Sequence, residues 1–462
     1  MGLLESAAAT IGADHVSVGN AISEDYAHDE ALTVAAVMPA LVARPGNTAD
    51  VVALVAMADE HGVPITARGS GTGLSGACTP TSASLVVSFE RMNAILEIDT
   101  ENHVAVVQPG VTLAQLDDAL KPHDLAYPVY PGEYSASLGG NVSTNAGGMR
   151  AVKYGVTRNQ VLGLEAVLPT GEVIRTGGKF VKATAGYDLT QLIIGSEGTL
   201  ALVTEAMLRV YPRMPFNATV LAPFSGLEAV TRAIPKIVAS GIGPMILEYI
   251  DMITLGAITA HVGLDLGIPA EIRDTTPAYL VVMMEQRTDE RLDEDVALLA
   301  EQLAALGAID VYVLPGAAAA SLIDAREKSF WVAKANNADD IVDIVVPRAS
   351  LSEFMDLVAT IAGDSGSWIA GCGHAGDGNV HLSVFQSDPA VRERVLHDLF
   401  AAGLGLGGAI SGEHGIGRAK QAHFLALEDP VKLALMHRIK TAFDPHNILN
   451  PGVLLDGEVV PR

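Results

Sequence analysis

The chain has 462 residues, of which 49% are hydrophobic and 18% charged, and its formal net charge at pH 7 is −25. This length and apolar content are enough for more than one hydrophobic core, so we expect two or three domains and exclude a one-domain protein. The strong negative charge repels nucleic-acid phosphates and anionic lipid. It therefore argues against nucleic-acid binding, and an anionic substrate must be held by a few local cations.

The cysteines and the apolar segments bear on the compartment. Cys78 and Cys372 are the only cysteines, and they form neither a CxxC pair nor a disulfide framework, as expected in a reducing compartment. The first residues lack a basic start with a continuous apolar run, and no later stretch reaches about 18 uncharged apolar residues. We therefore expect a cytoplasmic protein that is not an integral membrane protein, with peripheral attachment at the inner face of the membrane left open.

The first region alternates helices with short strands, after a helical and loop-like start over residues 1–40. Asn47 or Thr48 caps a helix whose apolar residues recur at helical spacing, and Gly62 ends it. A second helix is predicted near residues 113–120. The predicted short strands lie at residues 63–67, 85–89, 95–98 and 104–107. This mixture indicates an α+β region.

Later segments complete the predicted organisation. Residues 131–155 are rich in glycine, show almost no periodicity and are too long for an ordinary connection, so we expect a functional loop without regular structure. A hairpin is predicted around Pro169-Thr170-Gly171, and a boundary near residues 211–215. Alternating helices and strands follow to about residue 360. Two prolines in the tail over residues 441–455 block a long helix and favour a strap across the surface.

Two glycine-rich loops are candidate nucleotide sites. Gly71-Thr-Gly73-Leu-Ser-Gly76 satisfies the GxGxxG pattern, but a Rossmann turn needs a helix directly after it, and Ala77-Cys78-Thr79-Pro80 leads into another strand instead. A second match, at Gly403, Gly405 and Gly408, follows a helix and fails the same test. The loop RGSGTGLSG can instead line a concave anion site with unhindered N–H groups, which suits a pyrophosphate. The alternative is that this loop is a plain glycine turn. The second glycine-rich loop, over residues 131–155, offers the same chemistry, and two such loops in one domain make a plain turn less favoured.

The order of these segments resembles a known family. RGSGTGLSG, QPGVTL, PGEYSASLGGNVSTNAGG, Tyr154-Gly155, IIGSEGTL and the tail NPG resemble the FAD-linked oxidase family whose flavin domain is shared with vanillyl-alcohol oxidase and p-cresol methylhydroxylase (PCMH). The resemblance covers nearly the whole chain and implies an α+β fold. A two-subdomain FAD-binding domain of the PCMH type is expected over residues 1–213, an α+β substrate domain with an antiparallel sheet over 214–440, and a tail over 441–462 that returns to the FAD domain.

The resemblance also implies which residues bind FAD. The first loop would wrap the pyrophosphate, the second would run along the flavin, and residues 195–198 would contact the adenine side or its connecting backbone. The expected FAD-binding residues are Arg68, Gly69, Ser70, Gly71, Thr72, Gly73, Leu74, Ser75, Pro109, Gly110, Ser137, Gly139, Gly140, Asn141, Thr144, Asn145, Gly147, Gly148, Gly155, Gly195, Ser196, Glu197, Gly198 and Asn450. Some family members attach the flavin covalently through a histidine or cysteine. Here the first loop carries Ser70 and Thr72, and the nearest thiol is Cys78, so we expect non-covalent FAD.

A second constellation involves histidines. His374 and His381 flank a Gly376-Asp377-Gly378 segment, which can turn the chain and let both imidazoles converge. Glu413, in SGEHGIG, could complete a His₂Glu set that stays open to a further ligand, as zinc uses when it must also bind substrate. Hydrogen-bonded structural histidines are the alternative at this spacing, and the glycine framing favours a metal.

HAGDGNVH and EHGIG are similar to the D-2-hydroxyacid dehydrogenase branch of the family, which includes D-lactate and D-2-hydroxyglutarate dehydrogenases and the catalytic subunit of glycolate oxidase. The resemblance implies that His374, His381 and Glu413 bind a divalent, zinc-type metal. It also implies that the neighbouring His414 contacts the substrate and is the catalytic base.

Arg326, in LIDAREKSFWVA, matches the arginine that binds the substrate carboxylate in this branch, and a planar guanidinium suits that role. A surface arginine paired with Glu327 or Asp324 is the alternative. A lysine that holds the far carboxylate in the hydroxyglutarate enzymes corresponds to Val342 or its neighbours, which argues against a dicarboxylate unless Arg348 compensates.

Together with these residues, the resemblance implies an FAD-dependent dehydrogenase that oxidises a small, D-lactate- or glycolate-like D-2-hydroxy acid to the 2-oxo acid. The metal would lower the hydroxyl pKa, a histidine would take the proton, and flavin N5 would accept the hydride. Three alternatives stay open: an oxygen-using oxidase, a non-catalytic flavin subunit of a larger complex, and a metal hydrolase without flavin. Quinone, an electron-transfer flavoprotein, a cytochrome or a partner iron–sulfur subunit are compatible electron acceptors, and a homodimer is compatible as well.

Overall fold

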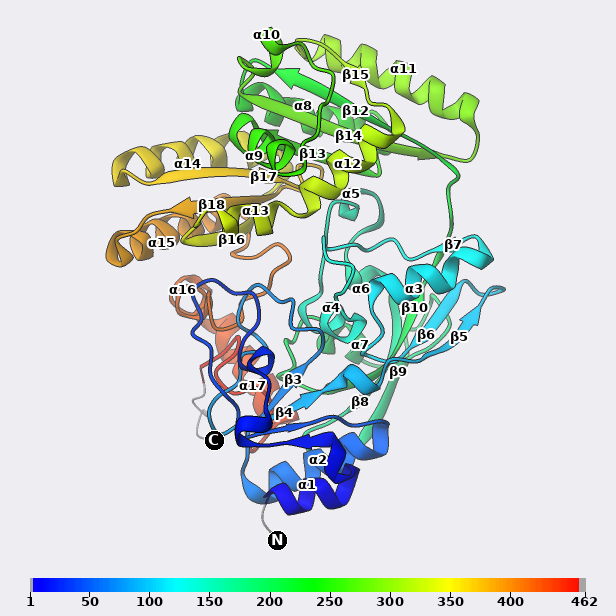
Figure 1. Cartoon of the computed structure of the whole chain (residues 1–462), viewed down its shortest axis with the longest axis vertical. Helices are drawn as coiled ribbons and strands as arrows, with labels where there is room; N and C mark the ends of the chain where they lie inside the picture. Colours follow the sequence, from blue (N-terminus) through cyan, green and yellow to red (C-terminus); the bar gives the residue numbers. More distant parts are fainter. Residues whose placement is uncertain (1–2, 457–462) are drawn as a thin grey trace.

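The computed structural model describes residues 3–456 and has two parts, which lie one above the other in Figure 1. The first part contains a four-stranded, a five-stranded and a two-stranded sheet and is drawn in blue and cyan, with the red C-terminal segment beside it. The second part, green to orange, is built around one seven-stranded sheet. The predicted α+β class is confirmed, since helices and mostly antiparallel sheets occur in both parts.

The first sheet has four strands, β1 (Val16–Ser17), β2 (Leu41–Ala43), β4 (Leu85–Ser88) and β3 (Ile65–Arg68), in that order. β4 pairs in parallel with both β2 and β3. Helix α2 (Thr48–His61), which packs beside α1 (Leu3–Ile11), begins where the Asn47 side chain accepts the N–H of Asp50 and ends where Gly62 turns left-handed. The predicted helix and its caps are confirmed. Since β3 ends at Arg68, the first glycine loop leaves from the end of a sheet strand.

The second sheet is antiparallel. Its strands, in spatial order, are β5 (Ile95–Asp99), β6 (Val104–Val107), β10 (Leu202–Arg209), β8 (Val161–Val167) and β9 (Val173–Gly177). β8 and β9 form the predicted hairpin. Helix α3 (Leu113–Leu120) is stabilised by a capping box between Thr112 and Gln115. β7 (Leu125–Ala126) and β11 (Tyr211–Pro212) pair where the chain leaves the first part.

The second glycine-rich segment contains more regular structure than its sequence predicted. Helices α4 (Leu138–Thr144) and α5 (Ala151–Tyr154) lie within residues 131–155, and α6 (Thr157–Gln160) follows. The Ser137 side chain caps α4 by accepting the N–H of Gly140, and Asn145, with φ 54°, ends it. A helix this short has too few turns for a readable periodicity, so the expectation of a structureless loop was wrong.

The C-terminal segment contacts the first sheet. α16 (Gln421–Leu427) and α17 (Pro430–Phe443) precede it. Leu449 forms a parallel bridge with Ile65, and Ile448 and Leu449 are buried in the same core as β3 and α2. The last described residues therefore lie beside the strand that leads into the first glycine loop.

The third sheet has seven antiparallel strands. Their order is β15 (Tyr312–Val313), β12 (Phe216–Phe224), β14 (Ala278–Gln286), β13 (Ile246–Asp251), β17 (Trp368–Gly373), β18 (Asn379–Phe385) and β16 (Asp340–Val345). The antiparallel sheet predicted for this region is confirmed.

Two hydrophobic cores cover the two faces of this sheet. Against one face pack α8 (Leu227–Ala239), α11 (Asp289–Ala305), α14 (Leu351–Ser365) and α15 (Pro389–Gly405). Against the other pack α9 (Met252–Val262), α12 (Gly316–Glu327) and α13 (Ser329–Ala335), while α10 (Ala270–Arg273) lies in the connection before β14. Successive strand residues alternate between the two cores, as a pleated sheet requires.

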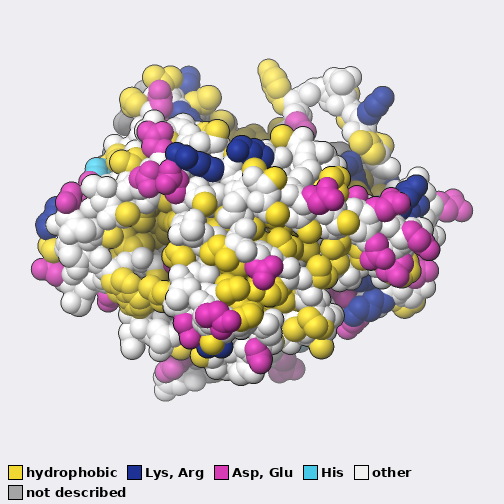
Figure 2. Space-filling view, turned by 90° about the horizontal axis from the view of Figure 1, so that it is seen from above, with side chains coloured by type: hydrophobic (Ala, Val, Ile, Leu, Met, Phe, Trp, Pro, Cys, Tyr) yellow, Lys and Arg dark blue, Asp and Glu magenta, His cyan; other side chains and the backbone are white. Residues whose placement is uncertain are grey.

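The surface carries exposed hydrophobic side chains over broad areas (Figure 2). Seen from above Figure 1, the molecule shows broad hydrophobic patches with acidic and basic side chains scattered between them (Figure 2). Within residues 3–456, every helix is too short or too polar to span a bilayer.

Candidate active site

The centre of the site lies on the seven-stranded sheet. Glu248 on β13, Asp343 on β16 and His381 on β18 each interrupt an apolar strand, and their strand neighbours point into the opposite core. Asp343 and His381 are direct cross-strand partners. Because side chains alternate along a strand, these three polar groups share the face that is not covered by α14 and α15.

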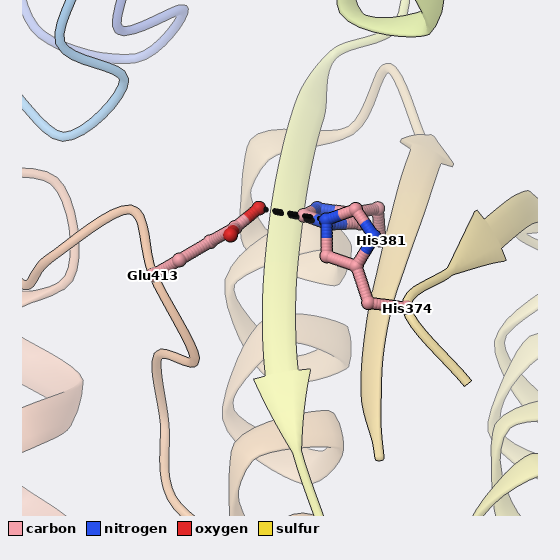
Figure 3. A group of neighbouring side chains, drawn as sticks. All are labelled: His374, His381 and Glu413. Atoms are coloured by element: carbon pink, nitrogen blue, oxygen red, sulfur yellow. Dashed lines mark hydrogen bonds and ion pairs between the residues drawn. The ribbon is translucent and has the colours of Figure 1, made fainter. Parts of the chain in front are cut away.

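Three of the predicted side chains meet on this face. His374 follows the end of β17, a turn reverses the chain into β18, and Glu413 reaches in from a loop beyond α15 (Figure 3). Oε1 of Glu413 lies 3.1 Å from Nε2 of His374 and 3.2 Å from Nε2 of His381. The ligand atoms of the three residues all lie within 4.8 Å of one another.

A buried carboxylate holds His374 from behind. Nδ1 of His374 lies 2.7 Å from Oε1 of Glu248, whose Oε2 lies 2.6 Å from Nη2 of Arg326. Burial lowers the pKa of His374, but the carboxylates of Glu248 and Glu413 outweigh burial and hold that pKa well above its usual value. Burial raises the pKa of Glu413, which the histidines reverse, so that it lies well below its usual value. The carboxylates of Glu248 and Glu413 therefore favour a positive charge at this cluster.

The cluster fits a divalent metal. Two ring nitrogens and one carboxylate are the donors of open zinc sites, and metal bonds of about 2.0–2.1 Å at tetrahedral angles separate neighbouring ligand atoms by about 3.3 Å. The two distances to Glu413 are close to that separation. Glu248 would fix the Nδ1–H tautomer of His374 and leave Nε2 free as a ligand.

His414 is held by a second buried carboxylate. Asp343 Oδ2 accepts the backbone N–H groups of Glu413 and His414 at 2.7 and 2.9 Å, and Lys420 donates to Asp343 as well. Nδ1 of His414 lies 3.4 Å from Oδ1 of Asp343. Burial lowers the pKa of His414 to about 4, because Asp343 offsets the lost solvation only in part and Lys420 opposes protonation. At pH 7 the imidazole is therefore neutral and able to accept a proton.

Two cavities meet at this point. The first is lined by both glycine loops, and the second lies against the seven-stranded sheet. They share Leu74, Pro131, Glu413 and His414. The expected FAD-binding residues that line the first cavity are Arg68, Gly69, Ser70, Gly71, Thr72, Gly73, Leu74, Pro109, Ser137, Gly139, Gly140, Asn141, Thr144, Gly147, Glu197 and Gly198. The two loops thus enclose one space whose far end reaches His414.

The other expected FAD-binding residues lie elsewhere. Gly148 lines the second cavity, and Gly110 lines a groove beside the first. The residues outside all of these linings are Ser75, Asn145, Gly155, Gly195, Ser196 and Asn450. Several of them support the loops. Asn450, for example, donates from Nδ2 to the carbonyls of Ala77 and Glu197, at 2.8 Å each.

Glu197 connects the first part to the loop that carries Glu413. This glutamate forms, with His374 and His381, the group of possible metal ligands that we call the metal-type cluster. The buried carboxylate of Glu197 accepts the backbone N–H groups of Ile416 and Gly417, at 2.8 and 2.7 Å. Gly417, with φ 55°, lies so close to Ser75 that an added Cβ would be 1.9 Å from the Ser75 carbonyl oxygen. A glycine is thus required at Gly417, where the EHGIG loop packs closely against Ser75 and Glu197 of the first part.

The residues predicted to select the substrate, Arg326, Val342 and Arg348, lie in three different environments. Arg326 is buried and lines the second cavity, where it pairs with Glu248 and donates to Ser329 at 3.2 Å. Its expected surface partner Asp324 pairs with Lys328 instead. On β16 the side chain in the cavity is Ile341, while Val342 lies in the opposite core. Arg348 is exposed.

Sequence reasoning missed three supporting groups: Glu248, Asp343 and Lys420. The two carboxylates had one available signal, since each stands inside an apolar strand, ILEYID or DIVDIV, where a charged residue is rarely buried without a partner. Lys420 had no such signal. Cys78, also unassigned, lines the first cavity.

The two glycine loops around one cavity and the histidine–carboxylate site at its end define an oxidoreductase that uses a nucleotide cofactor. Residues 39–177 match the FAD binding domain, and residues 213–454 match the C-terminal domain of FAD linked oxidases. The second match spans more than half of the chain, so the chain belongs to the FAD-linked oxidase family.

Individual relatives agree with this family. The chain is 57% identical over 444 residues to a protein of Mycobacterium tuberculosis (strain H37Rv) named as an uncharacterized FAD-linked oxidoreductase, covering 96% of this chain and 97% of the relative. It is 35% identical over 458 residues to a D-lactate dehydrogenase of Anaerostipes hadrus, covering 96% and 95%. The solved structure of p-cresol methylhydroxylase with substrate bound has a TM-score of 0.78 at 18% identity and covers 98% of this chain and 96% of that one. The predicted family and the PCMH-type fold are confirmed.

Proposed function

We propose that this protein is an FAD-dependent dehydrogenase that oxidises a D-2-hydroxy acid to the corresponding 2-oxo acid. One observation carries the proposal: Glu413 and His414 line both cavities. A ligand of the proposed metal and a neutral imidazole therefore stand at the border between the cofactor space and the substrate space. The relative named D-lactate dehydrogenase supports this substrate class and its handedness.

The proposed cofactors divide the chemistry. When bound, FAD supplies a hydride acceptor in the first cavity, and a divalent, zinc-type cation held by His374, His381 and Glu413 supplies charge that lowers the substrate hydroxyl pKa. The remaining work belongs to the chain's own side chains.

His414 is the proposed catalytic base. It takes the hydroxyl proton as the C–H bond of the substrate breaks, and its low pKa keeps it unprotonated beforehand. Asp343, close to Nδ1, stabilises the imidazolium that forms.

Arg326 is the proposed carboxylate-binding group. Its Nε carries no hydrogen bond to the described residues although it is buried, and an unpaired buried donor is costly unless a ligand accepts from it. A substrate carboxylate at this donor would turn the neighbouring hydroxyl toward the metal-type cluster and His414.

FAD is proposed to be non-covalent. Burial raises the pKa of the Cys78 thiol to about 12, so the thiolate needed to attack the flavin is absent at neutral pH. Cys78 and Cys372 line different cavities, so they do not form the cysteine cluster that would hold an iron–sulfur centre in this chain. Electrons must therefore leave through an external acceptor, for which quinone, an electron-transfer flavoprotein or a cytochrome are candidates.

The test is anaerobic bleaching of the flavin by a panel of D- and L-2-hydroxy acids, with and without a chelator. We expect D-acids to bleach the flavin, L-acids to fail, and chelation to abolish bleaching until zinc is returned. Bleaching that survives complete removal of metal would refute the metal assignment. Failure of every 2-hydroxy acid would refute the function.

A further inference from the structure

The second cavity continues far beyond the metal-type cluster. It has a volume of about 390 Å³ and runs along β17 and β18 under α9 and α13. The size matches cavities of about 300–1,000 Å³ that enclose drug-sized ligands. Glycolate or lactate, the small acids expected from the sequence, would leave most of this space to water.

The floor of the cavity is a regular ladder of cross-strand pairs. Cys372 pairs with His381, Ala370 with Ser383, and Trp368 with Phe385, and all six side chains line the cavity. These residues are two apart on each strand, so they share one face of the sheet. The ladder thus begins at a metal-type ligand and ends at an aromatic pair whose ring centroids are 4.4 Å apart.

The ladder sets the length of the cavity. His381 and Phe385 are four residues apart on one strand, which corresponds to about 13 Å at about 3.3 Å per residue. Trp368, at the far end, is 48% exposed, so this end reaches the surface. A substituent that starts at the metal-type cluster can therefore extend along the sheet toward solvent.

The lining beyond the cluster is mostly apolar, although Thr254, Asn336 and Ser383 also line the cavity. Helices α9 and α13 contribute Ile253, Ala257, Phe330 and Ala333, and β16 contributes Ile341. Among the described lining residues, Arg326 is the only lysine or arginine, and it lies at the cluster end, paired with Glu248. A second carboxylate on the substrate would meet this mostly apolar wall without a cation to balance its charge, at a desolvation cost.

We infer that the physiological substrate is a 2-hydroxy acid whose C2 substituent is an extended apolar chain, alkyl or phenylalkyl, lying on the Ala370–Ser383 and Trp368–Phe385 pairs. The inference rests on the proposed function and names the substrate class of that same site. The carboxylate and hydroxyl stay at Arg326 and the metal-type cluster, and the apolar chain fills the rest of the cavity.

The first test is a chain-length series on the holoenzyme. Flavin reduction is measured with D-lactate, D-2-hydroxybutyrate, D-2-hydroxyhexanoate, D-2-hydroxyoctanoate, D-3-phenyllactate and D-2-hydroxyglutarate. We expect kcat/KM to rise by about fourfold per buried methylene, with hydroxyglutarate below hydroxyhexanoate. A flat or falling series, while lactate reduces the flavin, would overturn the inference and leave the proposed function standing. If no acid of any length reduces the flavin, the proposed function fails, and the inference with it.

A variant at the middle of the ladder sharpens the test. Ala370→Leu fills the cavity between the cluster and the aromatic pair, so we expect kcat/KM for hydroxyoctanoate to fall at least tenfold and that for lactate to stay within threefold. Ile369→Leu is the matched control, because Ile369 packs against the opposite core. It should leave both values within threefold. An equal loss for lactate and hydroxyoctanoate in Ala370→Leu would contradict the inference, with the melting temperature and flavin content confirming that the variant is folded.

A binding measurement gives a readout without turnover. The chain has two tryptophans, so Trp331→Phe leaves Trp368 as the sole reporter. We expect 2-oxooctanoate to change Trp368 emission in a saturable manner and pyruvate at equal concentration to have no effect. Trp368 emission that does not change with 2-oxooctanoate, or that changes equally with pyruvate, would count against the inference.

Discussion

Glu248 and His374 are 126 residues apart in sequence, yet Oε1 of the one and Nδ1 of the other lie 2.7 Å apart in the buried centre of the site. The pairing leaves Nε2 of His374 directed at Glu413. The other oxygen of Glu248 faces Arg326, so one carboxylate positions both the proposed metal ligand and the proposed substrate-binding arginine.

Glu248→Gln should weaken metal binding. The amide keeps the shape of the side chain but loses the charge that orients His374, and loss of such a partner typically costs about 10- to 100-fold in metal affinity. Zinc titration of the metal-free protein measures this directly. Glu327→Gln, a neutralised neighbour of Arg326 outside the cluster, serves as the control. Equal zinc affinity in Glu248→Gln and wild type would show that Glu248 does not position the ligand.

His414→Ala should slow flavin reduction by about 10²–10⁴-fold, the usual cost of losing a general base. Zinc affinity should change little, because His414 is not among the three proposed ligands. FAD content should be largely retained, because His414 lines only the far end of the first cavity. Stopped-flow reduction by a D-2-hydroxy acid provides the measurement. A rate within about tenfold of wild type would assign the proton transfer to another group.

Glu197 should make stability depend on pH. Burial raises the pKa of its carboxyl to about 7, although the N–H groups of Ile416 and Gly417 oppose this rise. The folded-state pKa of Glu197 lies above its unfolded value of 4.5. The protonated carboxyl therefore contributes its full stabilisation of the fold below pH 4.5, and this contribution is lost as the pH rises through about 7. Thermal unfolding of the FAD-free protein between pH 4.5 and 8 should therefore show a larger deficit for Glu197→Gln at pH 5 than at pH 8. A deficit that is independent of pH would mean that Glu197 does not titrate in this range.

Gly417→Ala should destabilise the protein strongly. A Cβ would lie 1.9 Å from the Ser75 carbonyl oxygen at a residue with φ 55°, and strained backbone alone costs about 1–3 kcal/mol. Gly363→Ala is the matched control: this exposed position in α14 has open space around an added Cβ, and the change should stabilise by about 0.5–1 kcal/mol. Chemical denaturation of both variants decides the matter. A Gly417→Ala protein as stable as wild type would argue against the clamped loop.

The sequence by itself was enough to recognise the elements whose residues are dictated locally. The α2 caps at Asn47 and Gly62, the β8–β9 hairpin and the glycine loops could be read directly, because each depends on the conformational range of a few adjacent residues. His374, His381, Glu413 and His414 were singled out through short motifs that resemble those of a known family, and their roles stay predictions. Helix α4 was missed because its seven residues are too few for a periodic signal.

Only the tertiary structure decided which distant groups these residues meet. The cross-strand pairing of Asp343 with His381, the approach of Glu248 to His374 and the clamp of Glu197 on Gly417 join segments up to 220 residues apart. The depth of the cavity beyond them depends on the register of β17 against β18 and on helices packed from the other side. Such pairings result from the burial of whole sheet faces, which no local pattern records, and they determine the charges and space that a substrate would meet.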